Sequence, residues 1–229
     1  YADSEVDRTI GAAGSSDTDI DTYQFTVYGD YRWDAATYIN TQLGYGMNSG
    51  DQTRTFGGGF VANADVDSDV FFARLETGRD YDMDNGFTLT PIAMLNYQHI
   101  NPDSYTESGT CGAACLTVDT DSMNILEAGL GVEASYLHQN ADGSYIKPLA
   151  HAAYRYDFIG DEVEATNTFT GGGAAFQTDG FDPAQTTFNA GAGVTYYNTT
   201  NWELSAEYDF EYKSDYDAHS GLVRAAYKF

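Results

Sequence analysis

Apolar and polar residues alternate with a period of two along most of this chain. Residues 201–212, NWELSAEYDFEY, show it most clearly: aromatic and aliphatic residues hold the even positions, and acidic or hydroxyl residues the odd ones. Successive side chains of a β-strand point to opposite faces, so this pattern predicts strands with one apolar and one polar face. The pattern predicts nine such segments, at residues 23–31, 37–47, 71–78, 87–98, 126–136, 145–158, 188–196, 201–212 and 221–229. Residues 1–10 form part of a tenth.

The last segment, residues 220–229 with the sequence SGLVRAAYKF, ends the chain on an aromatic residue. Val223, Tyr227 and Phe229 share one predicted face, while Arg224 and Lys228 share the other. Soluble proteins rarely end on an exposed aromatic strand. In outer-membrane barrels the terminal strand closes the barrel and turns its outer face to lipid. This ending therefore favours a membrane barrel.

Short and long connectors alternate strictly between the predicted strands. The short ones are residues 32–37, 81–86, 139–144 and 197–201, and the long ones are residues 49–69, 101–122 and 160–185. Outer-membrane barrels have short periplasmic turns and long outer loops. The predicted fold class is therefore all-β, a transmembrane antiparallel up-and-down β-barrel with about ten strands in this chain. The order of connectors predicts a periplasmic C-terminus and extracellular long loops.

Composition agrees with a single barrel domain. The chain has 229 residues, of which 42% are hydrophobic, and it contains no run of about 18 apolar residues that could form a membrane-spanning helix. Its 19 tyrosines and 13 phenylalanines favour strands and interfacial aromatic girdles. The formal net charge of −25 argues against nucleic-acid binding, which needs clustered cations. An acidic surface is also typical of a high-salt source, in which case the charge says nothing about function.

Two cysteines, Cys111 and Cys115, lie in the second long connector. Their spacing favours a small disulfide loop, which fits an oxidising compartment. A zinc site or two free thiols are the alternatives. No second cysteine pair or neighbouring histidine cluster supplies the four ligands that structural zinc requires. We therefore predict a disulfide and no cofactor.

The polar faces of the predicted strands carry charges of both signs. One interpretation is a hydrated channel that passes an extended polypeptide; the other is a lumen stabilised by cross-strand ion pairs. The two interpretations are compatible. The predicted lumen-lining residues are Glu203, Glu207, Asp209, Glu211, Lys147, Arg155, Arg224 and Lys228.

Two acidic triplets occur in segments predicted as loops, namely Asp17, Asp19, Asp21 and Asp65, Asp67, Asp69. Alternate residues of an extended segment point the same way, so three carboxylates could share a cation. The sixth position counted from Asp65 is Val70, where a calcium loop of the helix–loop–helix kind needs glycine. Solvated loop acids are the simpler interpretation, and weak bridging to lipopolysaccharide by divalent cations is the other. No metal site is predicted.

The sequence gives little support to an enzyme. Outer-membrane proteases with ten strands use Asp and His at the outer rim, and His99 and His219 lie near predicted loop ends. Four scattered histidines are more often incidental. Neither a G-x-S-x-G elbow nor an H-E-x-x-H motif occurs. We predict no catalysis in this chain.

Four stretches together resemble the β-barrel translocator domain of bacterial autotransporters, a family of type V secretion. They are residues 21–31, 72–82, 89–109 and 220–229, and their order spans most of the chain. The resemblance implies a twelve-stranded intact domain, with a helix in its lumen and a passenger domain ahead of it. Residues 1–10 resemble the outer end of that family's third strand. We therefore expect the earliest strands, the helix and the passenger to lie outside these 229 residues.

The resemblance also implies a function: an outer-membrane barrel that anchors and helps translocate an N-terminal passenger, assembled by the cell's barrel-insertion machinery. The C-terminal strand, with Tyr227 and Phe229, would carry the insertion signal. The implied partners are outer-membrane lipid, lipopolysaccharide and the protein's own passenger segment. Two alternatives remain, a stand-alone acidic porin-like or adhesin-like barrel and an outer-membrane hydrolase.

Overall fold

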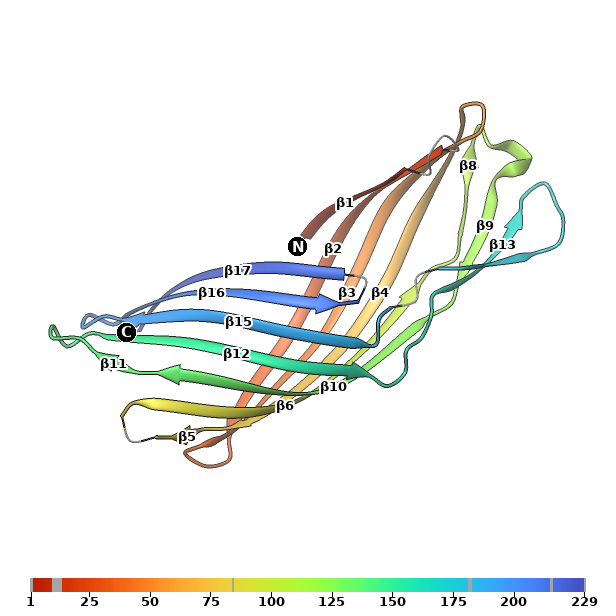
Figure 1. The fold of residues 1–229 in the computed structure, drawn as a ribbon. Coiled ribbons are helices and arrows are strands. Elements are labelled where there is room, and N and C mark those ends of the chain that lie inside the picture. Colours follow the sequence, from red (N-terminus) through yellow and green to blue (C-terminus); the bar gives the residue numbers. More distant parts are fainter. Residues whose placement is uncertain (1, 10–13, 84, 181–182, 215, 229) are drawn as a thin grey trace.

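The computed structural model describes residues 2–9, 14–83, 85–180, 183–214 and 216–228. Ten long strands form one curved antiparallel sheet, and each strand pairs with the next long strand along the chain (Figure 1). They are β1 (Ala2–Thr9), β2 (Gly14–Arg32), β3 (Thr37–Phe56), β4 (Phe60–Arg79), β6 (Phe87–Pro102), β10 (Met123–Tyr136), β12 (Tyr145–Asp157), β15 (Thr186–Tyr197), β16 (Trp202–Lys213) and β17 (Tyr216–Tyr227).

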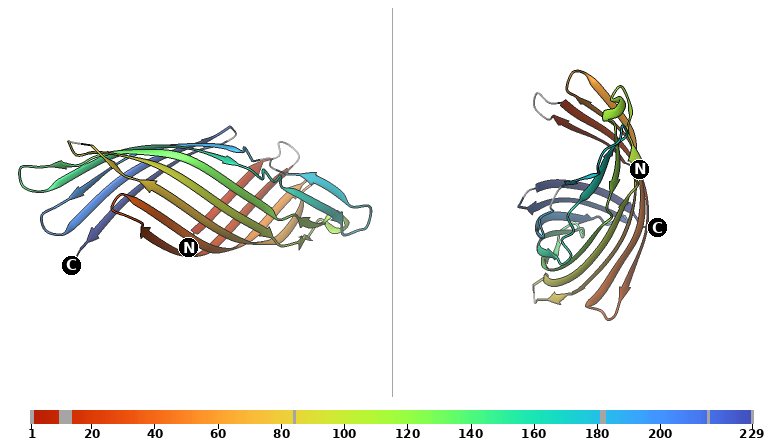
Figure 2. Two further views of the ribbon diagram at one scale, coloured as in Figure 1. Left: turned by 90° about the horizontal axis from the view of Figure 1, so that it is seen from below. Right: turned by 90° about the vertical axis from the view of Figure 1, so that its right-hand side faces the viewer.

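The sheet curls into a half-barrel, as the end-on view of Figure 2 shows. Its order follows the chain without a crossover, which confirms the predicted antiparallel up-and-down barrel fold and its ten strands. Among the described residues, no pairing joins β1 to β17. The first strand β1 pairs with the half of β2 between Gly14 and Thr22, next to the long connectors. No helix of the described residues is long and apolar enough to cross a membrane.

The two walls of the sheet differ in the way the alternation predicts. Large apolar side chains stand exposed on the convex wall; Val223 is 83% exposed and Phe25 is 72% exposed. Buried polar side chains lie on the opposite, concave wall, among them Thr90, Glu127 and Thr187. A water-soluble sheet would bury its apolar face against a second layer instead. The molecule is therefore apolar outside and polar inside.

The predicted loop at residues 49–69 is wrong. Strands β3 and β4 continue through it in register, with Gly50 opposite Val66, and a tight turn at Gly57–Gly59 joins them. Gly58 and Gly59 have φ of +89° and +85°, which residues other than glycine rarely adopt. Small residues such as Ala62 and Ala64 are buried on one face of this extension. The segment was mistaken for a loop because its other face is acidic rather than apolar.

The other two long connectors are partly ordered as a second sheet. Its four strands run in the order β14 (Phe176–Asp179), β13 (Glu164–Phe169), β9 (Leu116–Thr120) and β7 (Tyr105–Thr106). Three further short strands extend the main sheet: β5 (Tyr81–Asp82), β8 (Ser108–Gly109) and β11 (His138–Gln139). In Figure 1 the second sheet stands at the end of the half-barrel where the long connectors meet.

A partly buried ion pair attaches the second long connector to the β3–β4 hairpin. Arg54 donates from Nε and Nη2 to the two carboxylate oxygens of Glu107, at 2.8 and 2.7 Å. The same carboxylate accepts the backbone N–H of Leu116 at 2.8 Å. The hydrogen bonds to Glu107 raise the pKa of Arg54 above its ordinary value. This bidentate contact holds the connector against the hairpin in one position.

At the opposite end, short polar side chains hold the short turns. Asp34 accepts the backbone N–H groups of Ala36 and Thr37, at 2.8 and 2.7 Å, and these bonds lower the pKa of Asp34. Asn198 accepts the backbone N–H groups of Thr200 and Trp202, both at 2.8 Å. Such side chains mimic backbone turns, which explains how tight connections form at this end.

Candidate functional site on the concave wall

The odd-numbered residues of β10, β12, β15 and β16 share the concave wall, because register and alternation fix their side. One row crosses the sheet from Glu133 through His151, Gly191 and Asp209 to Ser220. Arg74 and Glu76 of β4 line the same 430 Å³ cavity as Glu207 and Asp209 of β16. Strands so far apart in the sheet order can share a cavity only on the side toward which the sheet curls.

Arg155 lies at the centre of an ion-pair network on this wall. Its Nη2 lies 2.6 Å from Oε2 of Glu211 on β16, and its Nε lies 3.4 Å from Oε2 of Glu127 on β10. Glu127 also lies 3.8 Å from the ammonium of Lys213 and accepts the hydroxyl of Thr187 at 3.3 Å. The side chains of Arg155 and Glu127 are only 15% and 12% exposed. The network ties together three neighbouring hairpins through poorly solvated charges.

The eight residues predicted to line the lumen do not all come together. Arg155 pairs with Glu211, and Lys228 lies 3.0 Å from Glu203. Asp209 pairs with His151, a residue that sequence reasoning did not single out. Lys147 lines a separate cavity together with Tyr145 and Tyr197. Neither Lys147 nor Arg224 forms an ion pair with any other described residue. That water wets this wall remains a prediction.

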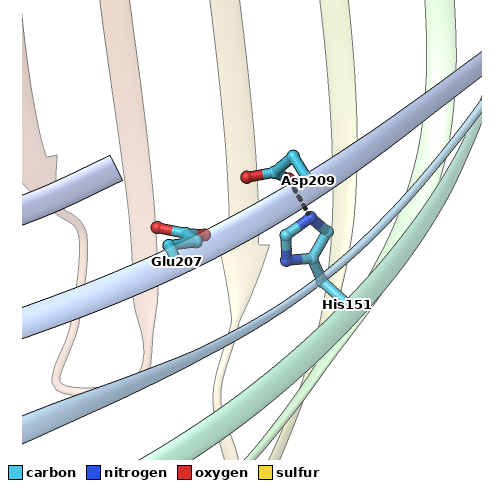
Figure 3. A group of neighbouring side chains, drawn as sticks. All are labelled: His151, Glu207 and Asp209. Carbon is cyan, nitrogen blue, oxygen red and sulfur yellow. Dashed lines mark hydrogen bonds and ion pairs between the residues drawn. The ribbon is translucent and has the colours of Figure 1, made fainter. Parts of the chain in front are cut away.

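His151 forms the second charged group, together with Glu207 and Asp209 (Figure 3). His151 Nε2 lies 2.8 Å from Asp209 Oδ1, and β15 runs between their two strands. A Cβ atom added at Gly191 would lie 2.5 Å from the imidazole Cε1 and 2.7 Å from Asp209 Oδ1. Glycine at this position is therefore what allows the two side chains to meet across β15. The signal in the sequence was a glycine between two polar positions on flanking strands.

Two aromatic residues pack against each other on the convex wall of the last hairpin. The rings of Trp202 and Tyr227 meet edge to face with centroids 5.2 Å apart. Tyr227 is 48% exposed on the convex wall. Phe229, the other residue of the predicted insertion signal, lies outside the described residues. Tyr227 therefore lies on the apolar convex wall, and its part in barrel insertion stays a prediction.

Cys111 and Cys115 are joined by a disulfide, with their Cα atoms 5.0 Å apart. The bond encloses the 3₁₀ turn Gly112–Ala114. Both cysteines are buried, with exposures of 5% and 4%, and they cluster with Ala62 and Phe56 of the β3–β4 hairpin. The disulfide therefore braces the second long connector at its contact with that hairpin.

The acidic triplets lie in strands, not in the loops where we expected them. Asp19 of β2 stands opposite Asp51 of β3, which stands opposite Asp65 of β4, and Glu5 of β1 continues the row. All four side chains are exposed. Like charges directly opposite each other destabilise a sheet. This acidic row is a repulsive surface at the long-connector end of the convex wall.

The two histidines considered for catalysis lie apart from the charged groups of the concave wall. His99 Nδ1 lies 3.0 Å from the amide oxygen of Asn124. His219 Nδ1 lies 2.6 Å from the hydroxyl of Tyr208, and its ring faces Phe210. The two residues lie on β6 and β17, which are not neighbours in the sheet. The structure therefore does not bring them together.

Comparisons with known proteins agree with this architecture. The family model described as "Autotransporter beta-domain" matches residues 1–209. The half-barrel also resembles the translocator domain of the autotransporter NalP from Neisseria meningitidis, with a TM-score of 0.70 and 20% identity, covering 95% of this chain and 69% of that one. The β domain of the Bordetella autotransporter BrkA gives a TM-score of 0.63 and 14% identity, with 96% and 85% coverage.

Curated relatives place the family in a membrane. Outer membrane protein A of Rickettsia conorii is 30% identical over 169 residues, which are 74% of this chain and 8% of the relative. Outer membrane protein B of Rickettsia typhi is 25% identical over the same share of this chain and 10% of its own length. The chain therefore spans about a tenth or less of these relatives. It is an outer-membrane β-barrel, and it belongs to the autotransporter β-domain family.

Proposed function

We propose that this barrel anchors in the outer membrane and helps an N-terminal passenger segment to reach the cell surface. The observation that carries the proposal is a barrel of the autotransporter family with an apolar convex wall and a charged concave wall. A charged inner wall is compatible with an extended, hydrated polypeptide, whose backbone polar groups would be costly to expose to hydrocarbon. In this role residues 1–229 act as one unit, and no residue is assigned a catalytic part.

We further propose an orientation, with the long connectors extracellular and the C-terminus periplasmic. Two long connectors, partly ordered as the second sheet, lie at one end of the barrel, and the turns held by Asp34 and Asn198 lie at the other. This supports the orientation, because barrels of this kind keep their short turns in the periplasm. The C-terminal strand β17 then enters the membrane as the element that the barrel-insertion machinery recognises. Tyr227 on the convex wall, together with Phe229, is assigned to that signal.

Passenger display is the direct test of this function. We expect an epitope placed in the passenger segment of the full-length protein, ahead of the barrel, to become accessible to protease on whole cells of a Gram-negative host. The control is a heat-modifiability gel, which reports whether the barrel itself is folded in the same cells. A folded barrel whose epitope stays in the periplasm would contradict translocation and favour a stand-alone porin-like or adhesin-like barrel.

We also propose that the acidic row contacts lipopolysaccharide through divalent cations. Its exposed carboxylates, Asp19, Asp51 and Asp65 among them, follow directly on the apolar part of the convex wall, where headgroup phosphates lie if the orientation above holds. Calcium and magnesium take oxygen ligands, so one divalent cation can bind a carboxylate and a phosphate together. It would offset the repulsion among the carboxylates and the repulsion between carboxylates and phosphates. The contact is weak and spread over several groups.

Asp51→Asn, at the centre of the row, tests this contact. In lipopolysaccharide-containing membranes, we expect chelation with EDTA to lower the unfolding temperature of the native barrel more than that of the variant. Without divalent cations, the variant should be the more stable by up to about 1 kcal/mol, because one repulsive carboxylate is gone. Asp30→Asn, on β2 but outside the row, is the control. Equal responses of all three proteins to EDTA would argue against the contact.

A further inference from the structure

We propose that His151, Glu207 and Asp209 form a binding site for a divalent transition metal of the zinc class. The imidazole Nε2 and one oxygen from each carboxylate are the protein ligands, and water completes the coordination. The ligand atoms of the three residues all lie within 4.8 Å of one another. Figure 3 shows the three side chains gathered on the concave wall, with His151 on one strand and both carboxylates on another.

The backbone between these strands is shaped to let the ligands converge. Strand β15 separates β12 from β16, yet it carries Gly191 and Gly193 in the rows that face the site. A Cβ atom at Gly191 would come within 2.7 Å of the imidazole Nε2. A Cβ atom at Gly193 would lie 3.4 Å from Cγ of Glu207. The two glycines form a depression in the wall, and the three ligands stand around it.

The ligand atoms lie close enough to converge on a metal with short bonds by small side-chain movements. Zinc binds nitrogen and oxygen at about 2.0–2.2 Å, which places neighbouring ligand atoms of a tetrahedron about 3.3–3.6 Å apart. His151 Nε2 and Asp209 Oδ1 are 2.8 Å apart and would separate only slightly. The side chain of Glu207 forms no hydrogen bond or ion pair with any described residue, although it is partly buried. Its carboxylate can therefore turn toward a metal without losing a partner.

The donor set selects the class of metal. One imidazole with two carboxylates suits zinc, cobalt, nickel or copper, whereas calcium and magnesium prefer oxygen ligands alone. Three protein ligands beside an open position are typical of zinc sites that retain water. The adjoining cavity of about 430 Å³ provides room for that water.

The charges around the site also favour a cation. Carboxylates outnumber guanidinium groups along this cavity, which is lined by Glu76, Glu133, Glu207, Asp209 and Glu211 against Arg74 and Arg155. Arg74 is paired with Glu76 at 2.9 Å, and Arg155 with Glu211 at 2.6 Å. Glu133, Glu207 and Asp209 therefore leave an excess of negative charge beside His151. A bound divalent cation would neutralise it and cross-link β12 to β16.

Metal titration of the intact protein, folded in detergent and freed of metal by chelation, tests the site. Zn²⁺ binding is followed by calorimetry and Co²⁺ binding by visible absorption, both in excess Mg²⁺ so that exposed carboxylates are occupied. We expect one tight site per chain and a Co²⁺ absorption spectrum characteristic of a low coordination number, with three protein ligands and water. His151→Gln and Asp209→Asn should each weaken Zn²⁺ binding at least tenfold. Gly191→Ala should weaken it too, because the added methyl group displaces both ligands.

Two variants keep the test decisive if those substitutions disturb folding. Glu207→Gln removes a ligand that holds no partner, so it should lower Zn²⁺ affinity while the heat-modifiable band stays unchanged. Glu203→Gln, on the same strand and wall but paired with Lys228, should leave Zn²⁺ affinity as it is. Unchanged affinity in His151→Gln, an equal loss in Glu203→Gln, or no tight site in the folded native barrel would each overturn the proposal.

Discussion

Replacing Arg155 by methionine should lower the free energy of unfolding of the barrel by about 3 kcal/mol. The substitution removes the guanidinium that lies between Glu127 and Glu211. The carboxylate of Glu127, whose side chain is only 12% exposed, then keeps only the more distant ammonium of Lys213, at 3.8 Å. Removing one partner of a poorly solvated ion pair is costly because the remaining charge stays desolvated. The loss is measured by urea-induced unfolding in detergent or lipid vesicles, followed by tryptophan fluorescence.

Two companion variants separate desolvation from a general effect of lost charge. Lys228→Met removes a cation that is 69% exposed and should cost no more than about 1 kcal/mol. Combining Arg155→Met with Glu127→Gln should recover part of the loss, since the buried charge is then gone as well. If Arg155→Met and Lys228→Met lowered the free energy of unfolding equally, the low solvation of the Arg155 network would make no difference to stability.

Loss of the aromatic end of the chain should give the largest effect on assembly. We expect deletion of Phe229 combined with Tyr227→Ala to reduce the folded, heat-modifiable barrel in outer membranes several-fold. The pair of rings formed by Tyr227 and Trp202, with centroids 5.2 Å apart, disappears at a cost of about 0.5–1.5 kcal/mol. The proposed insertion signal disappears at the same time, so that assembly should fall further than stability alone explains.

The control for this experiment lies one residue away. Lys228→Gln changes the same segment on the opposite wall and should leave the amount of folded barrel unchanged. Tyr227→Phe, which keeps the ring, should behave like the native protein when Phe229 is present. Normal levels of folded barrel in the double variant would contradict the assignment of the signal to these residues.

The sequence predicted the strands that have one apolar and one polar face. Residues 201–212 were expected as a strand, and the structure has β16 at Trp202–Lys213. The extensions of β3 and β4 were missed because a strand beyond the apolar part of the wall needs no apolar face. The second sheet was missed for another reason: Leu116 of β9 pairs with Phe169 of β13, and no local pattern encodes a pairing between distant loops.

The sequence predicted which charged residues lie on the polar faces, but not which of them pair with one another. Alternation placed His151 and Asp209 on polar faces, yet which rows meet depends on the register of two hairpins. Only the structure shows that Gly191 stands between them. The same holds for the acidic triplets: their spacing was visible, whereas the row formed by Asp19, Asp51 and Asp65 is a result of strand pairing.

Single cysteines along β16 measure most directly which wall of the sheet meets water. In the barrel reconstituted in lipid, cysteines at odd positions such as Glu207 and Glu211 should react rapidly with a water-soluble maleimide. Bimane probes at even positions such as Leu204 and Tyr208 should be quenched by brominated lipid. Equal reactivity at both sets of positions, or the opposite alternation, would contradict an apolar outer wall and a wet, charged interior.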